Sequence, residues 1–377
     1  MVKPSVLILG GMGFIGRNLV TYLVENSLCS HIRVVDKVMP VVAYLSPKQE
    51  QAMNHSYVES FQANLGVPAG VEKAFARTNG SWDFVFNLTA DTKYGQSLDI
   101  YRQRVLVPAQ LAADAAVRSN VSKFIHFSTA QVYAAKDKPS REDAKIKPWT
   151  NIAMIHHETE VHLRSLSSLP LIILRPAVVY GVGDTFGLMP RISTAAIYKF
   201  IGKTMEFLWS GDLRLNTVHV SDVCRAAFHL AEHGSVGSIF NLADKNDTNQ
   251  RKINEILELI FEIRTGFKNA ITSRLAATML GAATAKINGI HSEAWSEMVR
   301  QAKISITPYN AFLDEELLHN SPLSVCGEAI ESTGFSYEVP YLTVESVKEQ
   351  LDIAVEMGLF PRYHNYDGTG KASDEFE

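Results

Sequence analysis

The chain has few cysteines, no long apolar run and no excess of basic charge. Each of these features excludes a class of protein or of binding site. Its three cysteines, Cys29, Cys224 and Cys326, are far apart and form no CxxC pair, so neither a disulfide framework nor a metal site is expected. No apolar run reaches the roughly 18 residues of a membrane-spanning helix. The N-terminus MVKPSVLILGG also lacks the features of a signal peptide. We therefore expect a cytoplasmic protein.

Charge and composition bear on the partners of the protein. Thirty-six basic and forty acidic residues in 377 give a net charge of −4. Without a basic excess, neither a nucleic acid nor a membrane surface is expected as a partner. A hydrophobic share of 46% is that of an ordinary globular protein, although the polar end of the chain, 366–377, is expected to be disordered.

Short apolar runs rich in β-branched residues alternate with helical-period segments over the first 130 residues. The predicted strands are SVLILG (5–10), HIRVVD (31–36), SYVESFQAN (56–64), DFVFNLTA (83–90) and KFIHFST (123–129). LPLIILRPAVVYG (169–181) predicts a sixth strand, and weaker strand patterns follow within 214–244. Strands buried on both faces and separated by helices are typical of a parallel, doubly wound sheet.

The predicted fold is therefore α/β, a Rossmann-type doubly wound parallel sheet. Its domain is expected to cover 1–184, with the strands near 214–244 returning to it. From about residue 185 helical segments mix with loops, which predicts a smaller, mostly helical C-terminal substrate lobe over 185–365.

A glycine-rich loop follows the first predicted strand. LILGGMGFIGRNLV places Gly10, Gly13 and Gly16 between that strand and a helix, where glycine allows a tight turn and a close approach of a pyrophosphate. Asp36 ends the second predicted strand, where an acid can accept hydrogen bonds from ribose hydroxyls and repel a 2′-phosphate. The pattern predicts NAD as cofactor in preference to NADP, and the alternative is a tight turn without a ligand.

Further segments carry a resemblance to a known superfamily. The segments are NLTAD (87–91), FSTAQVY (127–133), LRPAVVYGVGD (174–184), VHVSDVCRA (218–226) and IFNLAD (239–244). Together with the glycine loop, they resemble the extended short-chain dehydrogenase/reductase superfamily. That superfamily includes nucleotide-sugar epimerases and dehydratases and 3β-hydroxysteroid dehydrogenases. The resemblance covers roughly residues 5 to 265 and implies an NAD-dependent oxidoreductase or isomerase that acts on a small-molecule substrate.

The resemblance also implies roles for individual residues. The residues implied for cofactor binding are Gly10, Gly13, Phe14, Ile15 and Gly16 at the pyrophosphate, Asp36 at the ribose, Asn64 and Leu65 at the adenine, Leu88 and Ala90 beneath the cofactor, and Pro176 to Val179 beside the nicotinamide. Thr129 falls on the catalytic hydroxyl of the superfamily.

The reactive pair of the superfamily is absent. A tyrosine and, four residues later, a lysine normally exchange the proton and hold the nicotinamide ribose. In WTNIAMIHHETE (149–160) these two positions are Ile152 and His156. Isoleucine cannot transfer a proton, so the position of the tyrosine supplies no acid/base.

Two replacements can be considered. ADTKYGQS (90–97) brings Lys93 and Tyr94 to the carboxyl edge of the sheet, where a phenol and an ammonium could take over the proton chemistry. The alternative is that both are ordinary loop residues. His156 could itself serve as an acid or base, and its alternative is a surface histidine.

Two functional classes remain open. The first is an NAD-dependent dehydrogenase, reductase or epimerase-type enzyme with a relocated acid/base, and the second is a degenerate relative that binds NAD as a sensor or scaffold. Leu215 stands where nucleotide-sugar enzymes of this group carry an arginine, which favours a substrate other than a nucleotide sugar. By analogy with the superfamily, a homodimer through the helices near 100–118 and 150–166 is expected.

Overall fold

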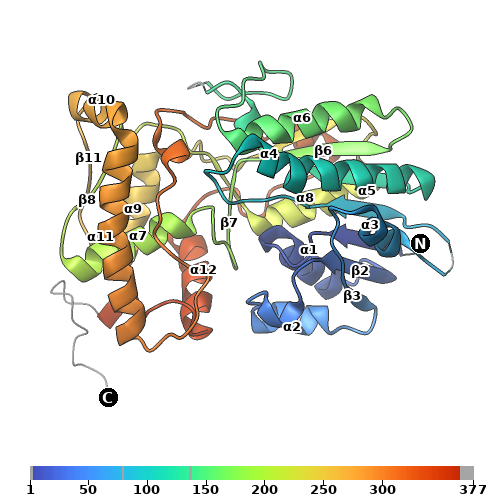
Figure 1. Cartoon of the computed structure of the whole chain (residues 1–377), viewed down its shortest axis with the longest axis horizontal. Coiled ribbons are helices and arrows are strands. Elements are labelled where there is room, and N and C mark those ends of the chain that lie inside the picture. The colour runs from blue at the N-terminus through green and yellow to red at the C-terminus, as the bar shows by residue number, and fades with distance from the viewer. Residues whose placement is uncertain (1–2, 79, 136–137, 366–377) are drawn as a thin grey trace. The chain divides into compact units, whose positions relative to one another are not determined.

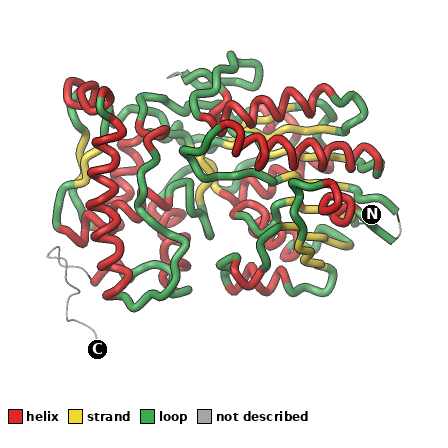
Figure 2. The backbone as a smooth tube through the Cα atoms, in the orientation of Figure 1, coloured by secondary structure: helices red, strands yellow, loops and turns green. Residues whose placement is uncertain are grey.

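The computed structural model describes residues 3–78, 80–135 and 138–365. The chain divides into two compact units. Figure 1 colours the chain by residue number, and Figure 2 colours it by secondary structure. The first unit runs to Ala177 and also includes Val218–Lys245 and Val325–Pro340. The second unit comprises Val178–Thr217, Asn246–Ser324 and the chain from Tyr341 onward.

A seven-stranded parallel sheet forms the centre of the first unit. Its strands, in spatial order, are β10 (Ile239–Leu242), β6 (Leu171–Pro176), β5 (Lys123–Phe127), β4 (Phe84–Asn87), β1 (Ser5–Leu9), β2 (His31–Asp36) and β3 (Val58–Gln62). The strand order reverses between β1 and β4, which are neighbours in the sheet. All residues of β1 and β6 are buried, because a parallel sheet is covered on both faces.

Helices cover both faces of this sheet. The helices of the first unit are α1 (Phe14–Glu25), α2 (Pro47–Met53), α3 (Pro68–Phe75), α4 (Leu98–Tyr101), α5 (Val107–Arg118), α6 (Asn151–Ser165) and α8 (Val220–His233). Helices α3, α5 and α6 share one apolar cluster with the sheet, to which they contribute Phe75, Ala112 and Leu163. Helices α1 and α8 pack together. The predicted doubly wound α/β fold is therefore confirmed.

The structure corrects two of the predicted strands. The run 169–181 is not one strand: β6 ends at Pro176, and β7 (Val178–Tyr180) lies outside the large sheet. The strand β9 (Thr217–His219) is also outside this sheet. It stops early because the side chain of His219 caps α8 by accepting from the N–H of Ser221. Within 214–244, β10 is the strand that joins the sheet.

The second unit is mainly helical. Its elements include α7 (Met189–Ile201), α9 (Gln250–Phe261), α10 (Ala270–Thr278), α11 (Leu280–Gln301) and α12 (Val344–Glu356), with β8 (Met205–Phe207) and β11 (Thr265–Phe267) forming a small parallel pair. An apolar cluster joins α7, α9, α11 and α12 and contains Phe261, Met298 and Leu351. None of the described helices in either unit is long and apolar enough to span a bilayer.

Candidate cofactor and active site

The glycine loop makes a tight turn against the segment after β4 and leads into the N-terminus of α1. Gly10 has a φ of +79°, and a Cβ there would lie 2.8 Å from the carbonyl oxygen of Leu88. Gly13 is the N-cap of α1, and no side chain caps this helix. The first N–H groups of a helix have no partner within it and attract anions. The residues predicted at the pyrophosphate, from Gly10 to Gly16, therefore form a helix N-terminus fit for a dinucleotide.

Asp36 is tied to the same loop. Its carboxylate accepts hydrogen bonds from the N–H of Met12 at 3.1 Å and from the N–H of Val38 at 3.0 Å. Since an ionised carboxylate offers about four acceptor sites, Asp36 retains capacity for ribose hydroxyls. The segment beyond β2 is anchored by the buried Arg17, which donates to the carbonyls of Ala43 and Tyr44. The sequence pattern did not predict that Arg17 would anchor this segment.

The remaining residues predicted near the cofactor follow β3 and β4. Leu88 and Ala90 come directly after β4, beside the point where the strand order reverses, which is where open α/β sheets bind ligands. Asn64 follows β3, and its side-chain oxygen accepts from the N–H of Gly66 at 2.9 Å. Leu65 is 7% exposed and packs in the core of the unit, so its side chain is a packing group.

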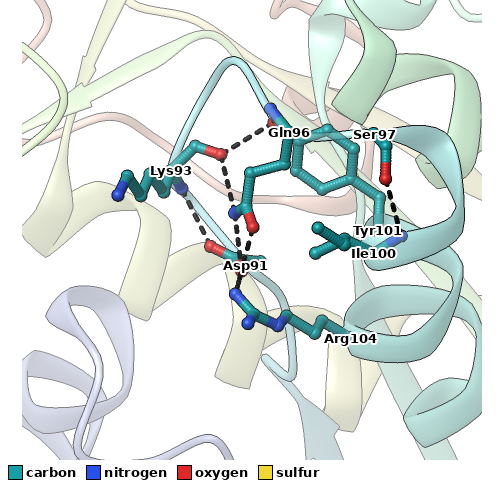
Figure 3. A network of polar contacts seen from close by, with 7 residues as sticks. All are labelled: Asp91, Lys93, Gln96, Ser97, Ile100, Tyr101 and Arg104. Carbon is teal, nitrogen blue, oxygen red and sulfur yellow. Dashed lines mark hydrogen bonds and ion pairs between the residues drawn. The ribbon is translucent and has the colours of Figure 1, made fainter.

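The loop after β4 is held by a network centred on Asp91 (Figure 3). Its carboxylate accepts from Arg104 at 2.6 Å, from Gln96 at 2.9 Å and from the N–H of Lys93 at 3.0 Å. Burial alone would raise the pKa of Asp91, but these hydrogen bonds lower it below its ordinary value. Tyr101 donates to the carbonyl of Lys93 at 2.7 Å, so the loop has a defined conformation.

The two candidate side chains of this loop differ in setting. Lys93 is exposed, and Figure 3 shows its ammonium directed away from the Asp91 network. Tyr94 is half-buried, and its hydroxyl accepts a hydrogen bond from Nε2 of Gln131 at 2.8 Å. Gln131 accepts in turn from the hydroxyl of Thr150 at 2.9 Å. Thr150 is the N-cap of α6, so this chain of bonds connects the loop after β4 to the start of α6.

Thr129 lies two residues before Gln131, the central residue of these hydrogen bonds. It precedes the short 3₁₀ turn Ala130–Val132, and its hydroxyl accepts from the N–H of Gln131 at 3.2 Å. The same glutamine therefore contacts the candidate hydroxyl through its backbone and the candidate phenol through its side chain. Gln131 and Thr150 were not predicted, because a bond between residues 37 positions apart leaves no periodic signal in the sequence.

Ile152 is part of an apolar cluster on α6. It is 6% exposed and packs with Tyr101, Val105, Leu106 and Ile155. Tyr94 packs against this same cluster. The position that the resemblance assigns to the reactive tyrosine therefore serves packing, and Tyr94 lies against the same cluster.

His156 is buried rather than on the surface of α6. It is 6% exposed, and its Nδ1 has no hydrogen-bond partner within the described residues. Burial lowers the pKa of His156 to about 4, partly opposed by Glu160. Burial also lowers the pKa of His126 to about 3, and His156 lowers it further. His126 and Asn87 contact each other at 3.1 Å from neighbouring strands. Both imidazoles are thus neutral near pH 7.

The residues predicted beside the nicotinamide are divided between the units. Pro176 ends β6 in the first unit, whereas Val179 belongs to β7 in the second. Also in the second unit, Leu215 packs against the apolar cluster. The neighbouring Arg214 is engaged with Asp247 at 2.7 Å.

The comparison with protein families gives an unambiguous result. The sequence model described as "NAD dependent epimerase/dehydratase family" matches residues 6–243. The chain belongs to this family of enzymes, which confirms the superfamily expected from its motifs. The matched range begins in β1 and extends past β10, so it covers every strand of the seven-stranded sheet.

Curated relatives and solved structures agree with this assignment. The chain is 24% identical over 270 residues to "Low-salt glycan biosynthesis protein Agl12" of Haloferax volcanii, covering 68% of this chain and 82% of that protein. It is 25% identical over 280 residues to a dTDP-glucose 4,6-dehydratase of an Actinoplanes species, covering 67% and 80%. A UDP-N-acetylglucosamine 4-epimerase structure from Methanobrevibacter ruminantium superposes with a TM-score of 0.68 at 17% identity, covering 94% and 99% of the two chains. This chain and the epimerase structure therefore share a fold.

Proposed function

We propose that the protein binds NAD and oxidises or reduces a hydroxyl- or carbonyl-bearing carbon of a small substrate, with Tyr94 as the proton partner. The bound nicotinamide would supply or accept the hydride. In the reducing direction Tyr94 donates its hydroxyl proton to the carbonyl oxygen, and in the oxidising direction its phenolate takes the proton of the carbinol. Thr129 orients the substrate oxygen, and the exposed Lys93 contributes positive charge beside Tyr94.

One observation carries this proposal. Tyr94 packs against the cluster that contains Ile152, while its hydroxyl is bonded to Gln131, two residues after Thr129. A phenol is therefore present against the α6 cluster although the helix has lost its own tyrosine. β4 and β5, which precede Tyr94 and Thr129, are adjacent parallel strands, so their carboxyl ends lie at the same edge of the sheet.

His156 is the weaker candidate for the acid/base. A general base is most effective when its pKa lies near the operating pH, and burial lowers the pKa of His156 to about 4. A neutral imidazole with so low a proton affinity accepts a proton poorly. We assign His156 a supporting role within α6.

NAD is the proposed cofactor rather than NADP. Asp36 ends β2 with its carboxylate directed to the glycine loop, where it bonds the N–H of Met12. A negative charge at this place accepts from ribose hydroxyls and repels a 2′-phosphate. The neighbouring Lys37 is exposed and does not neutralise Asp36 in any ion pair among the described residues.

The proposed substrate is a small molecule other than a nucleotide sugar. The relatives include a dTDP-glucose 4,6-dehydratase, but this chain has Leu215 in place of the arginine typical of such enzymes. Arg214 does not supply the missing guanidinium freely, because it is bonded to Asp247 and to the carbonyl of Asp212. A nucleotide sugar is the second candidate, favoured by the relatives.

The test is to identify what the purified protein retains and converts. Native mass spectrometry should find NAD(H) bound, and panels of alcohols, ketones and nucleotide sugars should then be followed by NADH absorbance and by product NMR, which detects isomers formed without net redox change. Turnover of an alcohol or ketone supports the proposal. Turnover confined to nucleotide sugars would overturn the substrate assignment. Bound NADH that exchanges hydride with no panel member would make the protein an NAD-binding sensor or scaffold.

A further inference from the structure

Helix α10 and the residue that caps its end expose large apolar side chains, while the helix buries a polar one. Ile271, Leu275 and Met279, spaced four residues apart, are 80%, 66% and 65% exposed. Ser273, on the opposite face, is fully buried and accepts from the N–H of Trp209 at 2.9 Å. Surface helices normally show the reverse arrangement. Packing within the second unit therefore leaves the apolar face of α10 uncovered.

The sequence of α10 and its flanking residues has no acidic residue. No Asp or Glu occurs between Glu262 and Glu293. The basic residues of this stretch are Arg264, Lys268, Arg274 and Lys286. Lys268 forms an ion pair with Glu206, whereas Arg274 and Lys286 are exposed and enter no ion pair within the described part of the chain. Arg274 is adjacent to Leu275, so positive charge borders the apolar stripe.

The first half of α11 extends this surface with small side chains. The exposed positions after Met279 include Gly281, Ala282, Ala285 and Gly289. Ile290 is 41% exposed. Acids come from other elements: the 3₁₀ turn Glu315–Leu318 packs against α11 and brings Glu315 close to Gly281. We call Ile271, Arg274, Leu275, Met279 and Lys286 the α10 surface.

We propose that the α10 surface docks the protein onto an anionic lipid bilayer. A helix that presents apolar side chains bordered by basic ones inserts them at the boundary of headgroups and acyl chains, and its cations attract anionic headgroups. The helix lies in the interface and does not cross it. The sequence predicts no membrane partner because the net charge of the whole chain is −4. That sum hides the locally positive charge of the acid-free stretch around α10.

A second copy of the chain fits the α10 surface less well. A two-fold contact of this face would place Arg274 and Lys286 against a copy of the same stretch, which carries no Asp or Glu to pair with them. An anionic lipid surface satisfies both the apolar and the basic groups. This assignment does not depend on the reaction that the enzyme catalyses.

Vesicle flotation with the full-length protein tests the assignment. Vesicles of phosphatidylcholine mixed with phosphatidylserine should carry the protein to the top of the gradient, and vesicles of phosphatidylcholine alone should carry much less. The triple variant Ile271→Ser, Leu275→Ser, Met279→Ser should weaken binding about tenfold or more, since it removes most of the inserted apolar area. The double variant Arg274→Gln, Lys286→Gln should lose the preference for phosphatidylserine and the sensitivity to salt.

Leu259→Ser is the matched control, because Leu259 of α9 is 71% exposed and lies outside the acid-free stretch. It should bind vesicles like the wild type, and all variants should keep wild-type NADH affinity and circular dichroism. Failure of the wild type to float, or equal flotation of the triple variant, overturns the proposal. A dimer in solution that the triple variant abolishes, without vesicle binding, would assign the surface to a second copy instead.

Discussion

The glycine loop and helix α6 lie in the same unit, yet they have kept different parts of the family pattern. The loop retains its glycines because the backbone requires them: Gly10 has a positive φ, and a Cβ at Gly16 would lie 2.6 Å from the Cα of Gly11. Helix α6 retains its structure through Thr150 at its N-cap and Ile152 in its apolar cluster. Neither feature needs the reactive tyrosine or lysine.

On the proposed assignment, the cofactor site and the acid/base change independently of each other. Replacing a glycine of the loop disturbs the backbone and the bound phosphate together, so the loop tolerates little variation. A side chain on α6 that is replaced by another of suitable volume leaves the core intact. The acid/base can then be a side chain of a neighbouring element. The hydroxyl of that side chain must reach the same edge of the sheet.

The largest expected effect is that of Tyr94→Phe. The ring still packs against the α6 cluster, but the hydroxyl that bonds Gln131 is lost. Once a substrate is known, turnover should fall about 100-fold or more, the usual loss of a general acid/base. The NADH affinity, measured by fluorescence titration, should be nearly unchanged.

His156→Gln and Lys93→Met separate the two candidate positions of the acid/base. The glutamine should leave turnover within about threefold of the wild type, because a buried neutral imidazole contributes little to proton transfer. Lys93→Met should lower turnover by about tenfold or more without affecting the binding of NADH. If Tyr94→Phe leaves turnover unchanged and His156→Gln abolishes it, the acid/base is on α6. The proposal that Tyr94 is the proton partner would then be wrong.

Gly13→Val should lower the affinity for NAD(H) about 100-fold or more, because its side chain would stand at the helix N-terminus that receives the pyrophosphate. In the free protein the nearest atom to a Cβ at Gly13 is the carbonyl oxygen of Gly10, at 3.2 Å, so the fold should adjust. Gly16→Ala is the contrasting variant and should lower the unfolding temperature. Calorimetry that finds equal NAD affinity in Gly13→Val and the wild type would contradict the assignment of this loop.

Asp36→Asn tests the choice between the two dinucleotides. The amide oxygen can still accept from the N–H of Met12, but the negative charge is lost. The affinity for NADH should fall by less than about tenfold, and the discrimination against NADPH should relax by about tenfold. An unchanged ratio of the two affinities would show that Asp36 does not face the ribose.

Much of the fold could be predicted from local patterns. Each of the first five predicted strands corresponds to a strand of the sheet, and β2 covers the predicted His31–Asp36. The break at Pro176 escaped prediction, because an apolar run continues through Val178 and Val179 and shows no change of period. Composition cannot show where such a run leaves a sheet.

The candidate site could be predicted less completely. The glycine loop and Asp36 have a fixed spacing that reflects one strand–turn–helix unit. The bonds of Gln131 to Tyr94 and to Thr150 join residues 37 and 19 positions apart, and they depend on how β4, β5 and α6 pack. The burial of His156 was likewise hidden, because its neighbours His157 and Glu158 are polar.

The smallest expected effect concerns His156 and the dependence of stability on pH. Burial lowers the pKa of His156 to about 4, against about 6.5 in an unfolded chain. The unfolded chain therefore binds a proton below pH 6.5 that the folded protein does not. The stability that this histidine contributes is fully present above that pH and is lost as the pH falls toward 4. The slope is at most about 1.4 kcal/mol per pH unit for each such histidine.

Urea unfolding between these two pH values should show this slope, with a further contribution from His126, whose pKa is lowered to about 3. His156→Gln should flatten the curve, because it removes the group whose pKa differs between the folded and unfolded chain. Glu160 opposes the shift of His156 and is itself paired with Arg175 at 2.5 Å, so Glu160 must be left intact in the test. An unchanged slope in His156→Gln would mean that His156 titrates normally in the folded protein. Helix α6 would then have kept a group able to exchange protons near neutral pH, and the difference between the loop and the helix would disappear.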